Sequence, residues 1–178
     1  MTDFDLNVLN WIQENLKCSF LDFLMPKVTL LATGGAIWII TAIILLLTKK
    51  HRKTGVIMLV GMLLGLIFGN LIIKNIVART RPYDINTSIK LIISKPSEYS
   101  FPSGHTLVSV ISATVLTIAN KKFALFAIPI AVLIAFSRLY LYVHYPTDIL
   151  GATVLGIVIG IFTYCFANKI YKTKKLRK

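Results

Sequence analysis

Long apolar segments without Lys, Arg, Asp or Glu alternate with short polar connections along this chain. A helix needs about 20 apolar residues to cross the hydrocarbon layer of a membrane. Four segments reach that length, residues 28–48, 54–73, 100–120 and 149–168. A fifth, 123–137, is shorter and extends to 143 if Arg138 faces protein or water instead of lipid. The pattern predicts an all-α polytopic membrane helix bundle with five transmembrane helices.

The N-terminal region, residues 1–26, has a different pattern. Its apolar positions recur at helical spacing, and they are Phe4, Val8, Trp11, Ile12 and Leu16. This spacing predicts an amphipathic helix at the membrane interface, which would make a six-helix core with the five spans. Ser19 and Asp22 resemble a capping box, so we expect a second helix to start there and to run through Pro26.

Composition narrows the class of protein further. Hydrophobic residues make up 56% of the 178 positions, charged residues only 15%, and the mean hydropathy is +0.74. These values exclude a soluble domain, and the apolar content excludes a disordered chain. The two cysteines, Cys18 and Cys165, form no C-x-x-C pair, so neither a disulfide framework nor a zinc site is expected.

The net charge of +13 bears on orientation in the membrane. The bases lie between apolar spans instead of forming a soluble patch, which argues against nucleic acid as a partner and for contact with membrane lipids. Threading five spans places twelve bases and no acid on one side, namely Lys49, Lys50, Arg52, Lys53, Lys121, Lys122, Lys169, Lys172, Lys174, Lys175, Arg177 and Lys178. That side, with the basic tail 169–178 and the C-terminus, is predicted to be cytoplasmic.

Glycines at four-residue spacing predict close helix packing inside one membrane-embedded domain, residues 1–178. They are Gly61, Gly65 and Gly69 in the second span and Gly156 and Gly160 in the fifth. The spacing serves contacts within one chain or between chains equally well, so it leaves the oligomeric state open.

Three polar groups fall at the outer ends of the predicted spans. The first contains Lys74, Arg79, Arg81 and Pro82. Lys74 and Arg81 would share one helix face if the helix persists to Arg81, although Pro82 favours a helix end about there. Taken alone, such bases are commonly anchors at the lipid interface.

The second group is Pro102, Ser103, Gly104 and His105, where the chain re-enters the membrane. Ser103 suits a helix N-cap, Gly104 permits close backbone approach, and the free amides of the first turn favour an anion. His105 then enters an apolar span, where a buried and hydrogen-bonded histidine is the commoner role.

The third group is Ser137, Arg138, His144 and Asp148. Pro146 suits the first turn of a helix, which lets Asp148 reach back to a ring nitrogen of His144. A carboxylate in that position fixes the histidine tautomer and stabilises a positive ring. Favouring the helix N-terminus is an equally good explanation for Asp148 taken alone.

Together the three groups resemble the signature of the type 2 phosphatidic acid phosphatase superfamily, which includes the vanadium haloperoxidases. The matching pieces are Lys-x6-Arg-Pro at 74–82, Pro-Ser-Gly-His at 102–105 and Ser-Arg-x5-His-x3-Asp at 137–148. The resemblance implies that His144 is the nucleophile, Asp148 orients it, and His105 is the acid and base. It also implies that the phosphate is bound by Lys74, Arg81, Ser103, Gly104 and Arg138.

The resemblance further implies a phosphatase that needs no metal or other cofactor, and the sequence shows no paired carboxylates for a two-metal site. We expect an integral-membrane lipid phosphatase that acts through a phosphohistidine at the extracytoplasmic face of the cell membrane. Its substrate would be a lipid phosphate such as undecaprenyl diphosphate, phosphatidylglycerol phosphate or phosphatidic acid. A lipid-headgroup phosphotransferase and a non-catalytic lipid-binding or transport protein of the same fold are the alternatives.

Overall fold

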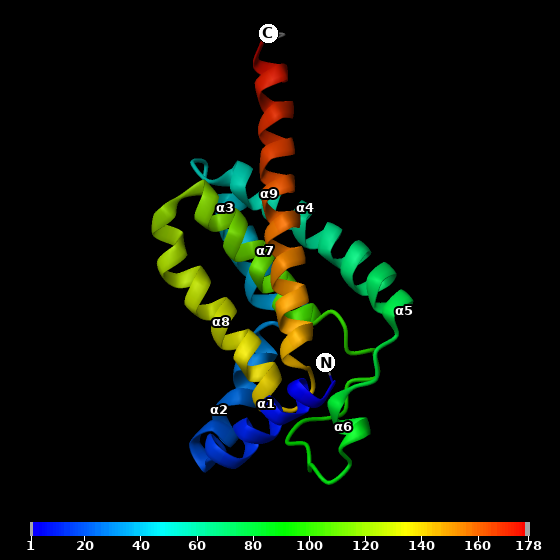
Figure 1. Cartoon of the computed structure of the whole chain (residues 1–178). Coiled ribbons are helices and arrows are strands. Elements are labelled where there is room, and N and C mark those ends of the chain that lie inside the picture. The colour runs from blue at the N-terminus through cyan, green and yellow to red at the C-terminus, as the bar shows by residue number, and fades with distance from the viewer. Residues whose placement is uncertain (1, 177–178) are drawn as a thin grey trace.

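The computed structural model describes residues 2–176, and the chain is helical, with no strand among these residues (Figure 1). The helices are α1 (Thr2–Asn15), α2 (Ser19–Leu31), α3 (Ala36–Leu47), α4 (Arg52–Gly65), α5 (Lys74–Val77), α6 (Pro82–Ile85), α7 (Gly104–Ala119), α8 (Ala124–Tyr140) and α9 (Pro146–Leu176). A π-helical segment, Leu66–Ile73, joins α4 to α5. The all-α prediction is confirmed. Arg177 and Lys178 of the predicted basic tail lie outside the described residues.

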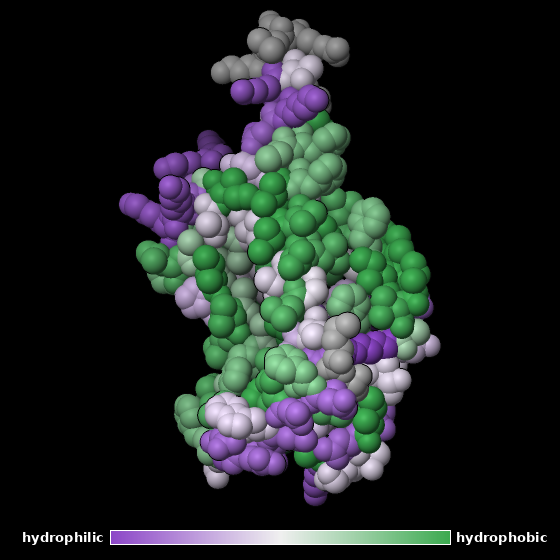
Figure 2. Space-filling model, in the orientation of Figure 1, coloured by the Kyte–Doolittle hydropathy of each residue, from purple (hydrophilic) through white to green (hydrophobic). Residues whose placement is uncertain are grey.

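The protein is a multi-pass membrane protein. Three stretches are long and apolar enough to cross a membrane, Arg52–Ile85, Lys121–Tyr140 and Pro146–Thr173. The pair α2 and α3 passes the same test as one span bent by 48°, and α7 is a shorter apolar helix of 16 residues. The count of five spans therefore stays a prediction. Figure 2 shows a broad hydrophobic surface between two ends rich in hydrophilic residues.

Helix α7 packs against α4, α8 and α9, and both glycine stripes lie against it. A Cβ atom added at Gly65 would come within 2.5 Å of the Ile111 side chain. A Cβ at Gly156 would come within 2.9 Å of Val110 and 3.2 Å of the Leu107 carbonyl oxygen. The prediction of close packing is confirmed, and these contacts lie within a single chain.

Replacing Gly156 by Leu should destabilise the protein, because the neighbouring atoms on α7 belong to the backbone and to a stiff β-branched side chain. We expect a loss of about 1–3 kcal/mol, the typical cost of overpacking, and a Tm several degrees lower in detergent. Val158→Leu is the matched control, since Val158 is 58% exposed on the same helix. Equal Tm values for the two variants would contradict the packing argument.

The predicted helix from Ser19 through Pro26 is confirmed as α2, which continues to Leu31. The expected capping box does not form, since Cys18 is the N-cap residue and the Asp22 carboxylate accepts a hydrogen bond of 2.6 Å from the Tyr140 hydroxyl. Gly34 and Gly35 follow α2 with φ values of 60° and 75°. Glycine adopts this left-handed backbone without steric cost, so the chain bends here before α3.

Helix α1 is present as predicted, and it buries two positions, Asp5 and Leu9, that the amphipathic pattern did not place on its apolar face. It packs against α8 and α9, and Leu9, Ile12 and Asp5 are its buried residues. Phe4 and Trp11, which we assigned to the apolar face, are 63% and 56% exposed. Asp5 can be buried because it is paired with Arg79, a long-range contact that helical periodicity does not report.

Candidate active site

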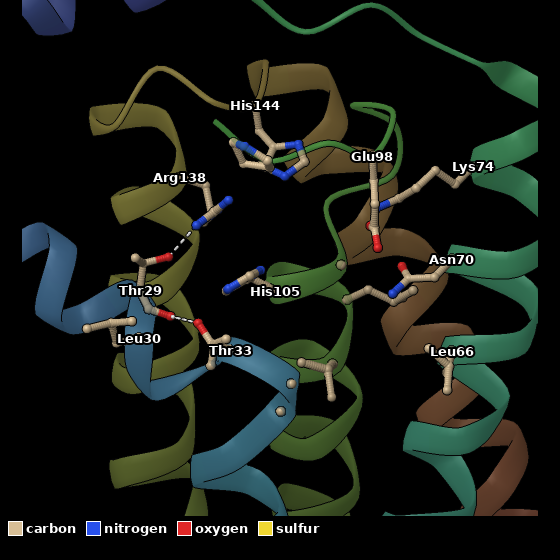
Figure 3. A pocket seen from close by; sticks show the side chains of 18 of the residues that line it. Thr29, Leu30, Thr33, Leu66, Asn70, Lys74, Glu98, His105, Arg138 and His144 are labelled. Atoms are coloured by element: carbon tan, nitrogen blue, oxygen red, sulfur yellow. Dashed lines mark hydrogen bonds and ion pairs between the residues drawn. The ribbon is translucent and has the colours of Figure 1, made fainter. Parts of the chain in front are cut away.

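A cavity of 890 Å³ lies between the α2–α3 bend, α4 with its π-helical continuation, and α7. Polar residues line one part of it, including Asn70, Lys74, Arg81, Glu98, His105, Arg138 and His144, and Gly104 lies among them. Apolar residues line the rest, including Leu30, Ile39, Leu63 and Leu66. In Figure 3, Lys74 and Asn70 face Arg138 and Thr29 across the space that His105 and His144 enter.

Six of the eight site residues predicted from the sequence line this cavity directly, and the other two lie buried beside them. Ser103 precedes α7, and its backbone N–H points to the Asp148 carbonyl oxygen at 3.5 Å. Asp148 lies behind His144, in the first turn of α9. Residues from three separate parts of the sequence thus meet at one end of the bundle, as predicted.

Lys74 and Arg81 reach the cavity by a route that the sequence analysis did not predict. The helix ends at Val77, and Ala78 has a left-handed backbone with φ of 46°. Arg81 follows in extended conformation, directly before Pro82. The condition for a shared helix face is not met, because the helix ends before Arg81, and the chain turns at Ala78 and returns Arg81 to the cavity.

Arg81 is fixed by carbonyl groups from two other segments. Its Nε donates to the Glu98 carbonyl oxygen at 2.6 Å, and its Nη1 donates to the Val143 carbonyl oxygen at 2.7 Å. Nη1 also lies 3.3 Å from Nε2 of His144. The guanidinium is thereby held next to the ring nitrogen that faces the cavity.

Three cations in the cavity wall are almost fully buried, since Lys74, Arg81 and Arg138 are 4%, 4% and 3% exposed. Glu98 pairs with Lys74 at 2.7 Å, and this bond holds the pKa of the Glu98 carboxyl below its usual value. Nε of Arg138 has no hydrogen-bond partner among residues 2–176. Buried cations in excess of their counter-ions favour a bound anion.

The N-terminus of α7 adds further donors to this wall. Ser103 is the N-cap residue as predicted, but its hydroxyl makes no capping bond and instead accepts a hydrogen bond of 3.0 Å from the Thr106 hydroxyl. Gly104 and His105 form the first turn and line the cavity. The free amides of such a turn point toward an anion.

The predicted contact between Asp148 and His144 is present, with Oδ2 lying 3.3 Å from ring Nδ1. The same Oδ2 accepts hydrogen bonds from the Ser100 hydroxyl and the Tyr145 backbone N–H, at 2.5 and 2.9 Å. A carboxylate fixed in this way keeps the ring proton on Nδ1, so that Nε2 carries no hydrogen atom and keeps its lone pair.

The environment of His144 favours its neutral form. Burial lowers the pKa of the ring to about 3, and the positive charges of Arg81 and Arg138 act in the same direction. The hydrogen bond with Asp148 opposes this shift only in part. At neutral pH the ring is neutral, with its one proton on Nδ1, and Nε2 can act as a nucleophile.

Sequence reasoning missed several polar residues at or behind this cavity. Thr29 accepts a hydrogen bond from Arg138, and the Oδ1 atom of Asn70 is buried with no partner in the described chain. Asn70 could have been noticed, because it is a polar residue in a predicted span, one turn before Lys74. Nothing in the sequence next to Asp5, Thr29 and Glu98 indicates that these residues lie at the site.

Among residues 2–176, no group of three His, Cys, Asp or Glu side chains is placed to hold a metal ion. A metal-independent reaction remains a prediction that a chelator tests.

A known protein family and several known proteins are similar to this chain in sequence. The family model described as PAP2 superfamily matches residues 54–172, which contain all eight predicted site residues. An undecaprenyl-diphosphatase of Sulfolobus acidocaldarius is 32% identical over 121 residues, covering 67% of this chain and 58% of that protein. Undecaprenyl-diphosphatase BcrC of Bacillus subtilis is 29% identical over 150 residues, covering 84% of this chain and 77% of the relative.

The fold is also similar to that of a solved structure, the transmembrane PAP2 type phosphatidylglycerolphosphate phosphatase from Bacillus subtilis. The TM-score is 0.77 at 24% sequence identity, with 95% of this chain and 87% of the other chain covered. The polar cavity with its histidines therefore lies in a fold that is shared with a membrane enzyme.

Proposed function

Because this chain belongs to the PAP2 superfamily, we propose that it is an integral-membrane lipid phosphatase that hydrolyses a lipid phosphomonoester or diphosphate. One observation supports this most directly. The neutral ring of His144, held by Asp148 on one nitrogen, presents the other nitrogen to a cavity with three buried cations. This arrangement provides a nucleophile and an anion site in contact with each other.

In the first half of the proposed reaction, Nε2 of His144 attacks the phosphorus atom of the bound phosphate. The bond from phosphorus to the leaving oxygen breaks, and His105 donates a proton to that oxygen. The product is a phosphohistidine, whose positive ring is stabilised by Asp148. Lys74, Arg81, Arg138 and the first-turn amides of α7 stabilise the charge on the phosphoryl oxygens.

In the second half, His105 takes a proton from water, and the resulting hydroxide attacks phosphorus. The bond from phosphorus to Nε2 breaks, which frees inorganic phosphate and restores neutral His144. One residue thus serves as acid and then as base, as two successive half-reactions require.

The substrate class follows from the two-part lining of the cavity. The cations select a phosphate or diphosphate group, and the apolar part suits a lipid chain that enters from the hydrocarbon layer. We place undecaprenyl diphosphate first among candidate substrates, because two relatives are named for that activity. Phosphatidylglycerol phosphate and phosphatidic acid are the next candidates.

The cavity is proposed to open at the extracytoplasmic face. The α3–α4 connection and the C-terminal end of α9 lie at one end of the molecule, and α1, α2 and α6 lie at the other (Figure 1). The basic connections are at the first end, which the charge rule places in the cytoplasm. His144 connects α8 to α9 at the opposite end, beside α1.

The proposed activity is tested with the full chain purified in detergent containing EDTA. We expect phosphate release from undecaprenyl diphosphate, phosphatidylglycerol phosphate or phosphatidic acid, with no added metal. Release that requires a divalent cation would refute the histidine mechanism. No release from any of these lipids by folded protein would instead favour a binding or transport role, and phosphate recovered on an added acceptor would identify a transferase.

A further inference from the structure

Arg79 lies behind the His144–Asp148 pair, on the side away from the cavity, and the mechanism above does not use it. Arg79 does not line the cavity, and its side chain is 22% exposed. Its Nη1 lies 2.6 Å from Oδ1 of Asp148, which is the oxygen that His144 does not contact. The catalytic pair is therefore enclosed by two arginines, with Arg81 beside the ring and Arg79 behind the carboxylate.

The other end of the Arg79 guanidinium is held by the N-terminal helix. Nη2 lies 2.6 Å from Oδ2 of Asp5, a carboxylate with no exposed surface. Asp5 also accepts hydrogen bonds from Thr147, at 3.1 Å from the backbone N–H and 2.7 Å from the hydroxyl. Thr147 directly precedes Asp148, so α1 and the start of α9 are joined at the catalytic carboxylate.

The backbone of Arg79 supports the same carboxylate from a second direction. Its carbonyl oxygen accepts the N–H of Ser100 at 2.8 Å, and the Ser100 hydroxyl donates to Oδ2 of Asp148 at 2.5 Å. The guanidinium also lies over the Tyr145 ring, 3.9 Å from its centroid. Arg79 therefore supports both oxygens of Asp148, Oδ1 directly and Oδ2 through Ser100.

We propose that Arg79 and Asp5 are positioning residues of the active site, which hold the Asp148 carboxylate so that Oδ2 faces His144. Arg79 alone would draw the carboxylate toward itself. Asp5 shares the guanidinium charge and limits that attraction. The three residues form a chain of alternating charge, Asp5–Arg79–Asp148, which ends at the ring of the nucleophile.

The series of alternating charges Asp5–Arg79–Asp148 affects the protonation of His144, which packing alone would not do. The charged groups that face His144 are Asp148 from α9, Arg81 from the turn before α6 and Arg138 from α8. If Arg79 becomes uncharged, the negative charge of Asp148 is no longer compensated, and the His144–Asp148 pair takes up a proton at higher pH. If Asp5 becomes uncharged, Arg79 pairs with Asp148 alone, and the proton is taken up at the same pH or lower.

The test compares Arg79→Gln and Asp5→Asn with the unmodified chain by ¹⁵N NMR titration of the His144 ring in detergent micelles. Arg79→Gln should raise the apparent pKa of the pair by at least about one unit, and Asp5→Asn should not raise it. A change of the same sign in both variants, or no change in Arg79→Gln, would overturn the proposal. This readout does not depend on phosphate release, so it separates the proposal from the phosphatase function on which it rests.

Kinetics with a lipid diphosphate provide a second readout in the same variants. The loss of Arg79 should lower kcat by roughly 10- to 100-fold, the usual size of the effect when a group that orients a functional side chain is removed. Since Arg79 lies away from the cavity, KM should stay unchanged. Arg79→Lys keeps the charge and should restore part of kcat, which decides the matter if Arg79→Gln fails to fold. The double variant of Arg79→Gln and Asp5→Asn should lose no more kcat than Arg79→Gln alone. A loss of kcat equal to the product of the two single losses would show that the two residues act independently.

Discussion

His144→Ala should lower phosphate release by at least about 1,000-fold, because it removes the atom that accepts the phosphoryl group. Nε2 of His144 is the ring nitrogen next to Arg81, and Nδ1 is already engaged by Asp148. No other histidine is held by a carboxylate among the described residues. We therefore expect no neighbouring group to replace the lost nucleophile.

The measurement is the initial rate of phosphate release from a lipid diphosphate, with His51→Ala as the matched control. His51 lies in the α3–α4 connection, where its ring contacts Phe123, and the cavity does not include it. The control should retain the activity of the unmodified chain and show that losing a histidine is not harmful in itself. Activity of His144→Ala within tenfold of that of the control would exclude a phosphohistidine on this residue.

Asp148→Asn should also have a large effect, a loss of about 1,000- to 10,000-fold in kcat. An asparagine of the same shape can turn its NH₂ group toward Nδ1 of His144, which moves the ring proton to Nε2. The nucleophilic nitrogen would then carry a hydrogen atom instead of a lone pair. The substitution also leaves the Arg79 guanidinium without one of its two buried carboxylates.

The matched control for this substitution is Asp84→Asn, on the same side of the molecule. Asp84 lies in α6 and is exposed, so its loss should leave kcat unchanged. Thermal unfolding of both variants shows whether Asp148→Asn is still folded at the assay temperature. A folded Asp148→Asn protein with normal kcat would mean that the carboxylate serves only the N-terminus of α9.

Local sequence patterns predicted which residues lie at the site better than they predicted the backbone turns and contacts that place them there. The spacing of the three motifs identified the residues that line the cavity, and Pro146 placed Asp148 in the first turn of α9, where it reaches His144. The contact between Asp148 and His144 could be predicted because it depends on neighbours within a few positions, whereas the meeting of the three distant motifs was indicated by the resemblance to a known family. The helix does not persist from Lys74 to Arg81, which a shared helix face would require, and the backbone turn at Ala78 has no clear sequence signal.

The sequence by itself determined the membrane class, the all-helical architecture and the distribution of charge, and it indicated which residues are candidates for the site. Each of these depends on local composition or on periodicity, which a single chain shows directly. Only the tertiary structure decided that Asp5 is buried, that Arg79 lies behind Asp148, and that Glu98 pairs with Lys74. Those contacts join segments from 24 to 74 positions apart, and a buried charge is tolerated only where folding supplies its partner.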